Sequence, residues 1–439
     1  MSRGASDEPW LRRVVPATPQ ELAAALWSFG YFFALLAGYY VLRPLRDQMG
    51  IAGGTRALPW LFSATFVTLL AAQPLYGALV AKLPRARFIP VVYHFFVVNL
   101  AVFWWLLAQD IAPVIVARVF FVWVSVFNLF AVAVFWSFMA DLFTSEQAKR
   151  LFGFIGAGGT AGALLGPMIT IALAVPLGPH NLLLAAIVFL EIAVFCAHRL
   201  ERSAGGRQGG PREVARVGGS AFAGISKLFR SPYLVGVGAW VSLLSFGATM
   251  LYFMQANVVS ATVHGAGEQT RIFASIDLAV GLLTLATQVF ATGRFLQRFG
   301  TGIAAGALPA VYVVGFLAIA WSPGLAVVLV FQVLQRWMNF AIANPARQVF
   351  FTVMDREDKY KAKNLIDVVV YRGSDALYGW VYDALHAAGL KLGAIALVAL
   401  PVVLAWLVLS GALGRTQERR ASKIAGEAPA PLGEPSWHR

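Results

Sequence analysis

Long apolar runs alternate with short polar segments along almost the whole chain. A membrane-spanning helix needs about 20 mostly apolar residues, because each residue advances only about 1.5 Å through a hydrocarbon layer about 30 Å thick. Twelve runs meet this requirement and predict an all-α membrane protein with twelve transmembrane helices. The predicted spans are 21–42, 57–81, 88–108, 113–143, 151–175, 181–197, 232–255, 272–292, 303–321, 324–354, 364–385 and 392–413.

A stretch rich in Gly and Arg, 205–219, separates the first six spans from the last six. Such a composition is typical of a flexible linker. We therefore expect two six-helix halves joined on one side of the membrane. The expected organisation is a tail at 1–20, the N-terminal half at 21–198, a linker at 199–231, the C-terminal half at 232–413 and a tail at 414–439.

The distribution of Lys and Arg orients these spans. On one side of the predicted membrane they fill both tails, the central linker and the loops that begin near Lys82, Lys149, Arg294 and Arg356. Basic residues concentrate in cytoplasmic loops of membrane proteins. We therefore expect a multi-pass protein of the inner (cytoplasmic) membrane with both termini in the cytoplasm. The loops on the other side hold only Arg43, Arg46, Arg56, Arg271 and Lys391.

The composition narrows the class of protein further. Hydrophobic residues make up 59% of the chain and charged residues 13%, which a soluble domain could not accommodate. The net charge is +14, but the basic residues lie in short segments between apolar runs, so we expect no nucleic-acid partner. The single cysteine, Cys196, excludes a disulfide framework and a cysteine metal site. The histidines do not have the spacing of metal ligands, and the sequence contains no nucleotide-hydrolysing loop and no recognisable set of catalytic residues. We therefore expect no metal, no cofactor and no enzymatic activity.

The two halves share an internal spacing. Trp123 lies 18 residues before Asp141, and Trp337 lies 18 residues before Asp355, at an offset of 214. Lys149 and Lys363 follow the two aspartates at the same distance of eight residues. Parallel repeats of six helices are typical of the major facilitator architecture, in which the substrate binds near the midplane between the halves. The repeat therefore predicts a transporter of that architecture.

Charged residues within the predicted spans are the candidate binding residues. An ionised side chain near the bilayer centre costs about 2.5–3.5 kcal/mol on insertion scales, so it should face a wet cavity or a partner. At 100° per residue, the polar residues of the first, fourth, tenth and eleventh spans fall on stripes. The predicted substrate-binding residues are Tyr39, Arg43, Arg46, Asp47, Arg118, Arg336, Asn339, Arg347, Asp367, Tyr371, Arg372 and Asp375.

Structural alternatives exist for three of these groups. Arg46 and Asp47 are also compatible with a cap at a helix end, and Arg118 with a side chain that reaches out to the membrane surface. Arg372 and Asp375, three residues apart, are also compatible with a structural pair on one helix.

The residue types at these positions indicate the charge of the substrate. The six basic residues among these candidates are all arginines, and guanidinium groups bind carboxylate and phosphate with two parallel hydrogen bonds. We therefore expect a small anionic substrate and no partner besides the lipid bilayer, with the chain working as a monomer. Glu191 and Asp277, in the sixth and eighth spans, are candidates either for proton coupling or for buried hydrogen-bonded acids.

Several segments resemble a known family. The segment 40–47 with Arg43, Arg46 and Asp47, the segments 135–141 and 146–153, and the segment 354–374 resemble corresponding parts of the ATP:ADP antiporters. The resemblance implies an anion exchanger in which Arg43 and Arg46 contact phosphates and Arg336 or Arg347 lies opposite. The sequence departs from this family at Asp375, where the family carries a Gly-Lys-Ser motif after the arginine of helix eleven.

A second resemblance supports an alternative function. Gly153, Gly162 and Gly166-Pro167 are spaced as in the fifth-helix motif of proton-coupled drug antiporters, although the closing Gly-Gly is absent. The sequence therefore predicts a secondary transporter that works by alternating access and exchanges an anionic or phosphorylated metabolite, with a nucleotide as one candidate. The alternative is a proton-coupled exporter of hydrophobic or cationic compounds.

Overall fold

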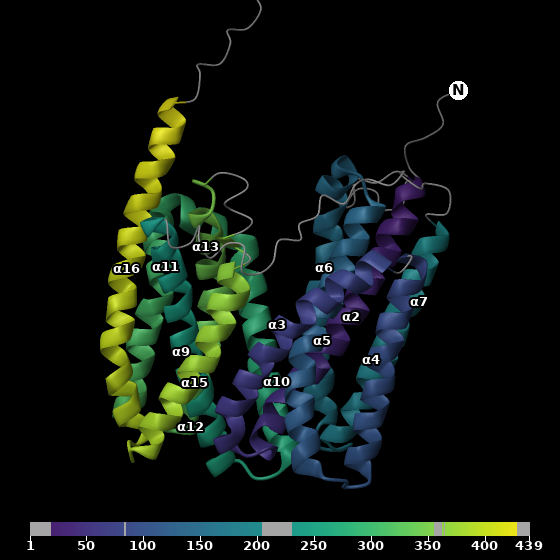
Figure 1. Ribbon diagram of the computed structural model, residues 1–439, viewed down its shortest axis with the longest axis horizontal. Coiled ribbons are helices and arrows are strands. Elements are labelled where there is room, and N and C mark those ends of the chain that lie inside the picture. The colour runs from purple at the N-terminus through teal and green to yellow at the C-terminus, as the bar shows by residue number, and fades with distance from the viewer. Residues whose placement is uncertain (1–18, 83–84, 204–230, 355–361, 364, 428–439) are drawn as a thin grey trace, which may run out of the picture.

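The computed structural model describes residues 19–82, 85–203, 231–354, 362–363 and 365–427. All regular elements among these residues are helices, so the predicted all-α membrane fold is confirmed (Figure 1). Eleven helices in this part of the chain are long and apolar enough to cross a membrane. The predicted eleventh span is the exception, because it consists of a short π-helix followed by a polar helix of 17 residues.

The N-terminal half contains six long helices. These are α2 (Pro19–Ala52), α3 (Leu58–Lys82), α4 (Arg85–Ala108), α5 (Pro113–Leu142), α6 (Ser145–Leu173) and α7 (Leu182–Ser203). The 3-10 turns η1 (Thr55–Ala57) and η2 (Pro179–Asn181) precede α3 and α7.

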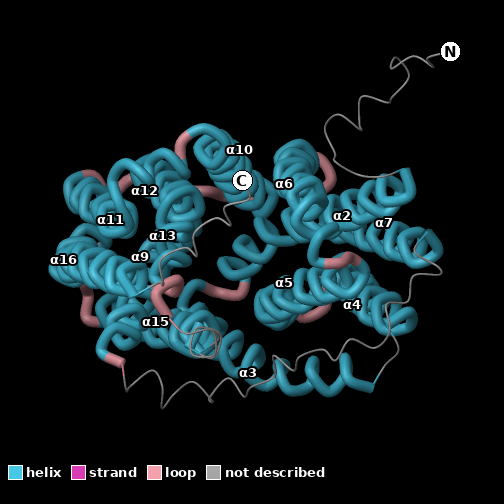
Figure 2. Tube along the Cα trace, turned by 90° about the horizontal axis from the view of Figure 1, so that it is seen from above, coloured by secondary structure: helices cyan, strands magenta, loops and turns pink. Residues whose placement is uncertain are grey.

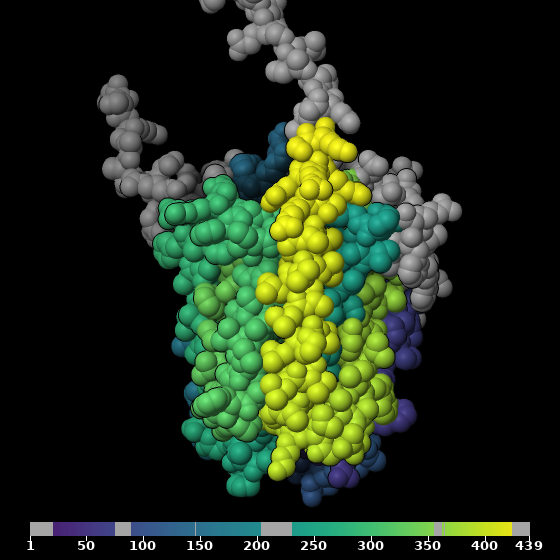
Figure 3. Space-filling view, turned by 90° about the vertical axis from the view of Figure 1, so that its left-hand side faces the viewer, coloured from purple at the N-terminus to yellow at the C-terminus, as the bar shows by residue number. Residues whose placement is uncertain are grey.

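The C-terminal half repeats this arrangement with two interrupted helices. Its elements are α9 (Pro232–Thr262), α10 (Ala266–Phe290), α11 (Thr292–Trp321), α12 (Leu325–Met338), η3 (Asn339–Ala343), α13 (Asn344–Phe350), η4 (Leu365–Val370), α15 (Tyr371–Ala387) and α16 (Leu392–Glu427). The predicted tenth span is thus α12, the π-helix η3 and α13 in sequence. Figure 3 shows α16 running along the outer face of this half.

Each half has its own hydrophobic core. The N-terminal core is built around aromatic residues of α2, α4 and α5 such as Tyr31, Phe127 and Phe135. The C-terminal core contains Trp240 and Trp406 with their neighbours, and it also takes in a few N-terminal residues, among them Leu58 and Phe121. Figure 2 shows the helices of the two halves as two groups that meet at a boundary.

Small residues allow α2 and α6 to pack closely. A Cβ atom on Gly158, Gly162 or Gly166 of α6 would overlap backbone atoms of Phe29, Phe33 or Ala37 of α2. Small residues at every fourth position let helix backbones approach in this way. These glycines therefore fix the position of α2, which carries the first predicted site residues.

The halves touch through crossed pairs of helices. The second helix of each half packs against the fifth helix of the other, as α3 does against α15 and α10 against α6. At the end of the bundle remote from Pro19 and Glu427, α3 and α15 are in contact through Trp60 and Trp380, whose ring centroids lie 4.8 Å apart. At the same end, a Cβ on Gly267 of α10 would overlap the backbone of α6. That end is therefore closed, and in Figure 1 the halves diverge toward the end where α2 begins and α16 ends.

The internal repeat and the linker are only partly described. Trp123 stacks between phenylalanines of the N-terminal half, whereas Trp337 donates a hydrogen bond from Nε1 to Thr287 Oγ1. Asp355, the counterpart of Asp141, and the predicted linker stretch 205–219 lie outside the described residues.

Candidate binding site between the two halves

A cavity of about 250 Å³ lies at the boundary between the two halves. Helices of both halves contribute to its wall: α2, α3 and α5 from the N-terminal half, and α9, α12, η3 and α15 from the C-terminal half. The lining residues are Tyr39, Arg43, Arg46, Phe62, Thr65, Phe66, Phe121, Ser125, Asn128, Ala248, Thr249, Tyr252, Gln332, Gln335, Arg336, Asn339, Phe340, Tyr371, Arg372 and Asp375.

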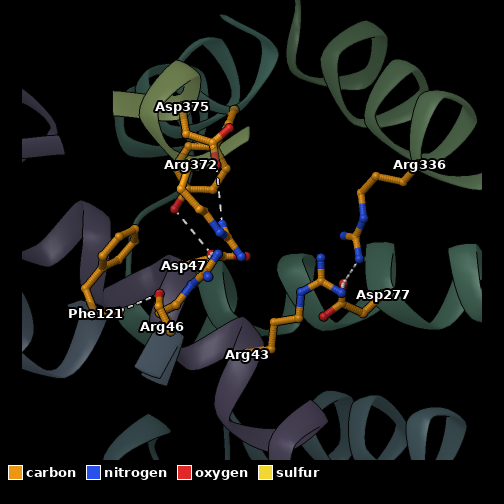
Figure 4. Close-up of polar contacts among 10 residues, drawn as sticks. Arg43, Arg46, Asp47, Phe121, Asp277, Arg336, Arg372 and Asp375 are labelled. Atoms are coloured by element: carbon orange, nitrogen blue, oxygen red, sulfur yellow. Dashed lines mark hydrogen bonds and ion pairs between the residues drawn. The ribbon is translucent and has the colours of Figure 1, made fainter. Parts of the chain in front are cut away.

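Two arginines from different halves converge on one aspartate in this region. Arg43 Nη1 of α2 lies 3.5 Å from Asp277 Oδ1 of α10, and Arg336 Nη2 of α12 lies 2.5 Å from the same oxygen. Figure 4 shows the two guanidinium groups approaching the carboxylate from different directions. The Asp277 side chain is only 2% exposed. The three residues therefore form an ion cluster that joins the halves at the edge of the cavity.

A second ion pair lies within α2, and a hydrogen bond links it to the other half. Arg46 donates to Asp47 Oδ1 over 2.7 Å from Nη2 and 3.1 Å from Nε. Tyr252 of α9 donates its hydroxyl hydrogen to the same carboxylate oxygen at 3.2 Å. The Arg46 guanidinium also lies 5.0 Å from the ring centroid of Phe121, within cation–π range. The pair is thus part of the cavity wall and holds α2 against α9.

A third pair belongs to the C-terminal half alone. Arg372 Nη1 lies 3.3 Å from Asp375 Oδ2 on the next turn of α15. The other carboxylate oxygen accepts hydrogen bonds from Ser245 at 2.6 Å and Thr249 at 3.4 Å. These contacts neutralise Arg372 and anchor Asp375 to α9. Asp375 is therefore bound within its own half.

The charges around the cavity do not cancel. Four guanidinium groups face three carboxylates, and Asp277 is shared between two arginines. Each arginine has a carboxylate partner, but these seven groups together carry a net charge of +1 at this boundary. Within a low-dielectric protein such a charge attracts an anion far more strongly than it would in water.

Several polar atoms at the cavity are buried without a hydrogen-bond partner in the described part of the chain. They include Thr65 Oγ1, Arg336 Nε and Asn339 Oδ1. A buried polar atom without a partner costs about 1–3 kcal/mol, so it marks a place where a ligand or water completes the bonding. Asn339 is also the first residue of η3, and single π-helical turns occur frequently at functional sites.

A second cavity of about 590 Å³ adjoins the first and shares Arg336 and Phe340 with it. Arg347 of α13 lies in its wall and forms an ion pair of 3.3 Å with Asp367 of η4. Gly156 and Gln348 also line this cavity. Gly156 lies in the half of α6 that is nearer to Ser145, and Gln348 lies in the last turn of α13, so the second cavity extends from Asp277 and Arg336 toward the end where the halves diverge.

The structure brings most of the predicted site residues together. Those that line the first cavity are Tyr39, Arg43, Arg46, Arg336, Asn339, Tyr371, Arg372 and Asp375. Asp47 and Asp277 pair with three of these arginines, whereas Arg347 and Asp367 belong to the second cavity.

Two predicted residues lie elsewhere. Arg118 Nε donates to the carbonyl oxygen of Gly53 at 2.8 Å, so this guanidinium stabilises the end of α2 instead of facing the cavity. Glu191 of α7 is half-exposed and its Oε2 lies 3.6 Å from Nε2 of His94 on α4. Its environment is therefore an outer surface of the N-terminal half. The sequence pattern did not distinguish this surface from the interior, because α7 is apolar on all sides.

The prediction that Arg347 shares one face with Gln332, Arg336 and Asn339 assumed a regular helix. The five residues of η3 interrupt that regularity, because a π-helix has more residues per turn than an α-helix. Arg347 lines the second cavity, together with Arg336, and does not line the first.

The sequence analysis missed some of the lining residues. Thr65 and Phe66 of α3 and Asn128 of α5 lie in the wall of the first cavity. Asn128 follows Ser125, which the pattern did select, by three residues and therefore shares its helical face. The residues of α3 carry no comparable signal, because an isolated threonine is common in apolar spans.

Among the described residues no group of His, Cys, Asp and Glu side chains is arranged to hold a metal ion. The donors that face the cavity are guanidinium, hydroxyl and amide groups.

Comparison with known proteins gives a family and a fold. The family model described as Major Facilitator Superfamily matches residues 22–360. No curated protein sequence matches the chain.

Solved structures share the fold at low sequence identity. A bacterial homologue of the iron transporter ferroportin, in an inward-facing state, has a TM-score of 0.66 and 12% identity, over 91% of this chain and 100% of that chain. The nucleoside transporter NupG has a TM-score of 0.58 and 14% identity, over 92% and 99%. A POT family transporter in complex with 5-aminolevulinic acid has a TM-score of 0.61 and 13% identity, over 89% and 96%. At these identities the similarity concerns the fold alone.

Proposed function

The chain belongs to the major facilitator superfamily, and on this premise we propose that it exchanges an anionic, phosphorylated metabolite across the cytoplasmic membrane. Its family and its structural neighbours make it a secondary membrane transporter and not an enzyme. The exchange, the anionic substrate and the cellular membrane are the parts that we propose.

The observation that carries the proposal is the arrangement of Arg43, Arg336 and Asp277. Two guanidinium groups from opposite halves meet at one carboxylate, at the edge of the central cavity. A negatively charged substrate gains the most electrostatic binding free energy where positive charge exceeds negative charge and water is scarce. It also draws the two halves together, because each half supplies one of the arginines.

The character of the donors favours phosphate over other anions. Arginine presents a planar fork that matches two phosphate oxygens, and it never loses its proton. Arg336 Nε and Arg347 Nε are both buried without a hydrogen-bond partner in the described chain, so each retains an unused donor. The two arginines lie in adjoining cavities, which suits a ligand with more than one charged group.

A nucleotide is the substrate that we propose to test first. Aromatic side chains alternate with the arginines around the cavity, and planar rings stack favourably with a base. Those aromatic residues are Tyr39, Phe62, Phe66, Phe121, Tyr252, Phe340 and Tyr371. The resemblance of segment 40–47 to the ATP:ADP antiporters supports the same choice.

Alternating access follows from the asymmetry between the two ends of the bundle. Trp60 and Trp380 close one end, whereas the second cavity leads toward the other. The positive loops support an orientation in which the end that holds Pro19 and Glu427 faces the cytoplasm. On this orientation the structure corresponds to a state that opens inward.

The alternative, proton-coupled export of hydrophobic or cationic compounds, has less support. Of its two candidate coupling residues, Glu191 lies on an outer surface and Asp277 is occupied by two arginines. A cavity with excess positive charge would also repel a cation. We therefore assign Asp277 to the anion site and leave Glu191 without a role in transport.

Reconstituted transport tests the proposal. Purified protein in liposomes should take up labelled ATP or ADP faster when unlabelled nucleotide is loaded inside, and an imposed pH gradient should not change the rate. Uptake that does not exceed that of protein-free liposomes would reject a nucleotide as the substrate. Uptake that follows the pH gradient regardless of internal anion would reject exchange.

A further inference from the structure

Asp277 lies between Arg43 and Arg336, where a substrate anion would be bound most strongly. Its side chain is 2% exposed, and one oxygen, Oδ1, lies within 3.5 Å of guanidinium nitrogens from both Arg43 and Arg336. Arg336 and Asp277 belong to the C-terminal half, whereas Arg43 belongs to the N-terminal half. The ion pair that crosses the boundary is therefore the one between Arg43 and Asp277.

We propose that Asp277 is an internal counter-anion that competes with the substrate for Arg43 and Arg336 and allows the empty transporter to change state. This inference rests on the proposed function, because it assumes an anionic substrate at the same site. In this role Asp277 sets the affinity for the substrate anion. It also sets how much of the transport is exchange and how much is net movement of substrate.

The first consequence concerns affinity. A substrate anion that binds to the two arginines must displace Asp277 or share them with it, because like charges in a low-dielectric site repel. Part of the attraction between anion and arginines is therefore cancelled by the loss of the internal ion pairs. Removing the charge of Asp277 should strengthen anion binding.

The second consequence concerns the empty transporter. When the halves close around an empty site, Arg43 and Arg336 come together away from water, and two unneutralised charges there are costly. Asp277 pairs with both and reduces their combined charge from +2 to +1, so the empty protein can pass through the closed state at a lower cost. Without Asp277 only a bound anion supplies that charge, and the transporter should work by strict exchange.

The hydrogen bonding around Asp277 supports the idea that a ligand can displace its carboxylate from Arg43 and Arg336. Apart from the guanidinium groups of Arg43 and Arg336, no described residue donates a hydrogen bond to the carboxylate of Asp277, and Arg336 Nε has no acceptor. By contrast, Asp375 accepts hydrogen bonds from Ser245 and Thr249 in addition to its ion pair. A permanent buried ion pair is normally completed by such hydrogen bonds. The Asp277 cluster lacks them and leaves donors for a ligand.

The test compares Asp277→Asn with the wild type in two assays. The first is binding of ADP and of inorganic phosphate to the purified protein. The second is release of labelled ADP from liposomes, with ADP outside (exchange) and without it (net efflux). We expect the variant to bind about tenfold more tightly, equal to about 1.4 kcal/mol, to retain exchange and to lose about tenfold of its net efflux.

Two further variants complete the test. Glu268→Gln removes an exposed acid from the same helix, where it pairs with Arg271 outside the cavity, and should leave both assays unchanged. Asp277→Glu keeps the charge and should keep net efflux. If Asp277→Asn unfolds more easily, ADP should raise its unfolding temperature by more than it raises that of the wild type.

The outcomes separate this inference from the proposed function. Weaker or unchanged binding by Asp277→Asn, or an equal loss of exchange and net efflux, overturns the counter-anion role while the anion site stands. A wild-type protein that binds neither ADP nor phosphate overturns both proposals.

Discussion

Trp380 of α15 donates a hydrogen bond from its indole Nε1 to Ser63 Oγ of α3, over 3.0 Å and across the boundary between the two halves. Together with the contact between Trp60 and Trp380, this bond closes the end of the bundle remote from the termini. A transporter that exposes one site alternately to each side must break these contacts in every cycle.

A cross-link between these two positions should therefore stop transport. Cys196 is the only native cysteine, so Ser63→Cys and Trp380→Cys in a Cys196→Ala background provide a defined pair. We expect a short cleavable thiol cross-linker to abolish nucleotide exchange in liposomes and a reducing agent to restore it.

A cross-link inside one half serves as the control. Trp104 Nε1 donates to Asn181 Oδ1 at 3.0 Å within the N-terminal half. Trp104→Cys with Asn181→Cys should cross-link without loss of exchange. Full exchange by the protein cross-linked between positions 63 and 380 would show that this end does not open.

The close packing of α2 and α6 predicts an asymmetric effect of alanine substitutions. A methyl group on Gly162 would overlap the backbone of Phe33 and Ala37, whereas a Cβ on Gly153 meets no atom within 4 Å. Overpacking of this kind costs about 1–3 kcal/mol, while alanine is about 1 kcal/mol better than glycine inside a helix. Thermal unfolding in detergent should show Gly162→Ala destabilised and Gly153→Ala equal to the wild type or more stable. Equal effects would mean that α2 and α6 are not packed as described.

Substitution of Asn339 should weaken anion binding without lowering the stability of the fold. Its Oδ1 is buried at the cavity without a hydrogen-bond partner in the described chain, so Asn339→Ala removes no internal bond. We expect an unfolding temperature close to that of the wild type and roughly tenfold weaker anion binding, equivalent to one lost hydrogen bond of about 1.4 kcal/mol.

Gln335, on the preceding turn, provides the contrast. It accepts a hydrogen bond from the Tyr312 hydroxyl at 2.8 Å and donates to Gln332 at 3.2 Å. Gln335→Ala leaves the buried Tyr312 hydroxyl without its acceptor and should lower stability by about 1–3 kcal/mol. If Asn339→Ala lost stability to the same extent while binding normally, Asn339 would be a structural residue.

The sequence allowed much of the site to be predicted because charges are rare in apolar spans. Arg43, Arg46 and Arg336 stand out there, and the cost of placing them in lipid requires them to face the interior. The helical period was sufficient to place Arg43 and Arg46 on one face of α2, where both line the cavity.

Other features depend on how the helices are arranged and could not be predicted from local patterns. Asp277 is the only acid in its predicted span, and its partners on α2 and α12 become its neighbours only when the halves meet. The π-helix η3, between Arg336 and Arg347, is a change in backbone geometry that no residue type in this segment indicates. Glu191 faces outward because α4, with His94, packs beside α7.

The central claim is that Arg43 and Arg336 bind the charged part of the substrate. The most direct test is the unfolding temperature of the purified protein with ADP, ATP, other phosphorylated metabolites and uncharged nucleosides. Arg336→Gln is compared with Arg271→Gln, which removes an exposed arginine outside the cavity. We predict that phosphorylated compounds raise the unfolding temperature of the wild type and of Arg271→Gln but not that of Arg336→Gln, and that nucleosides have no effect. An equal rise in Arg336→Gln, or a rise with the uncharged compounds alone, would contradict the account.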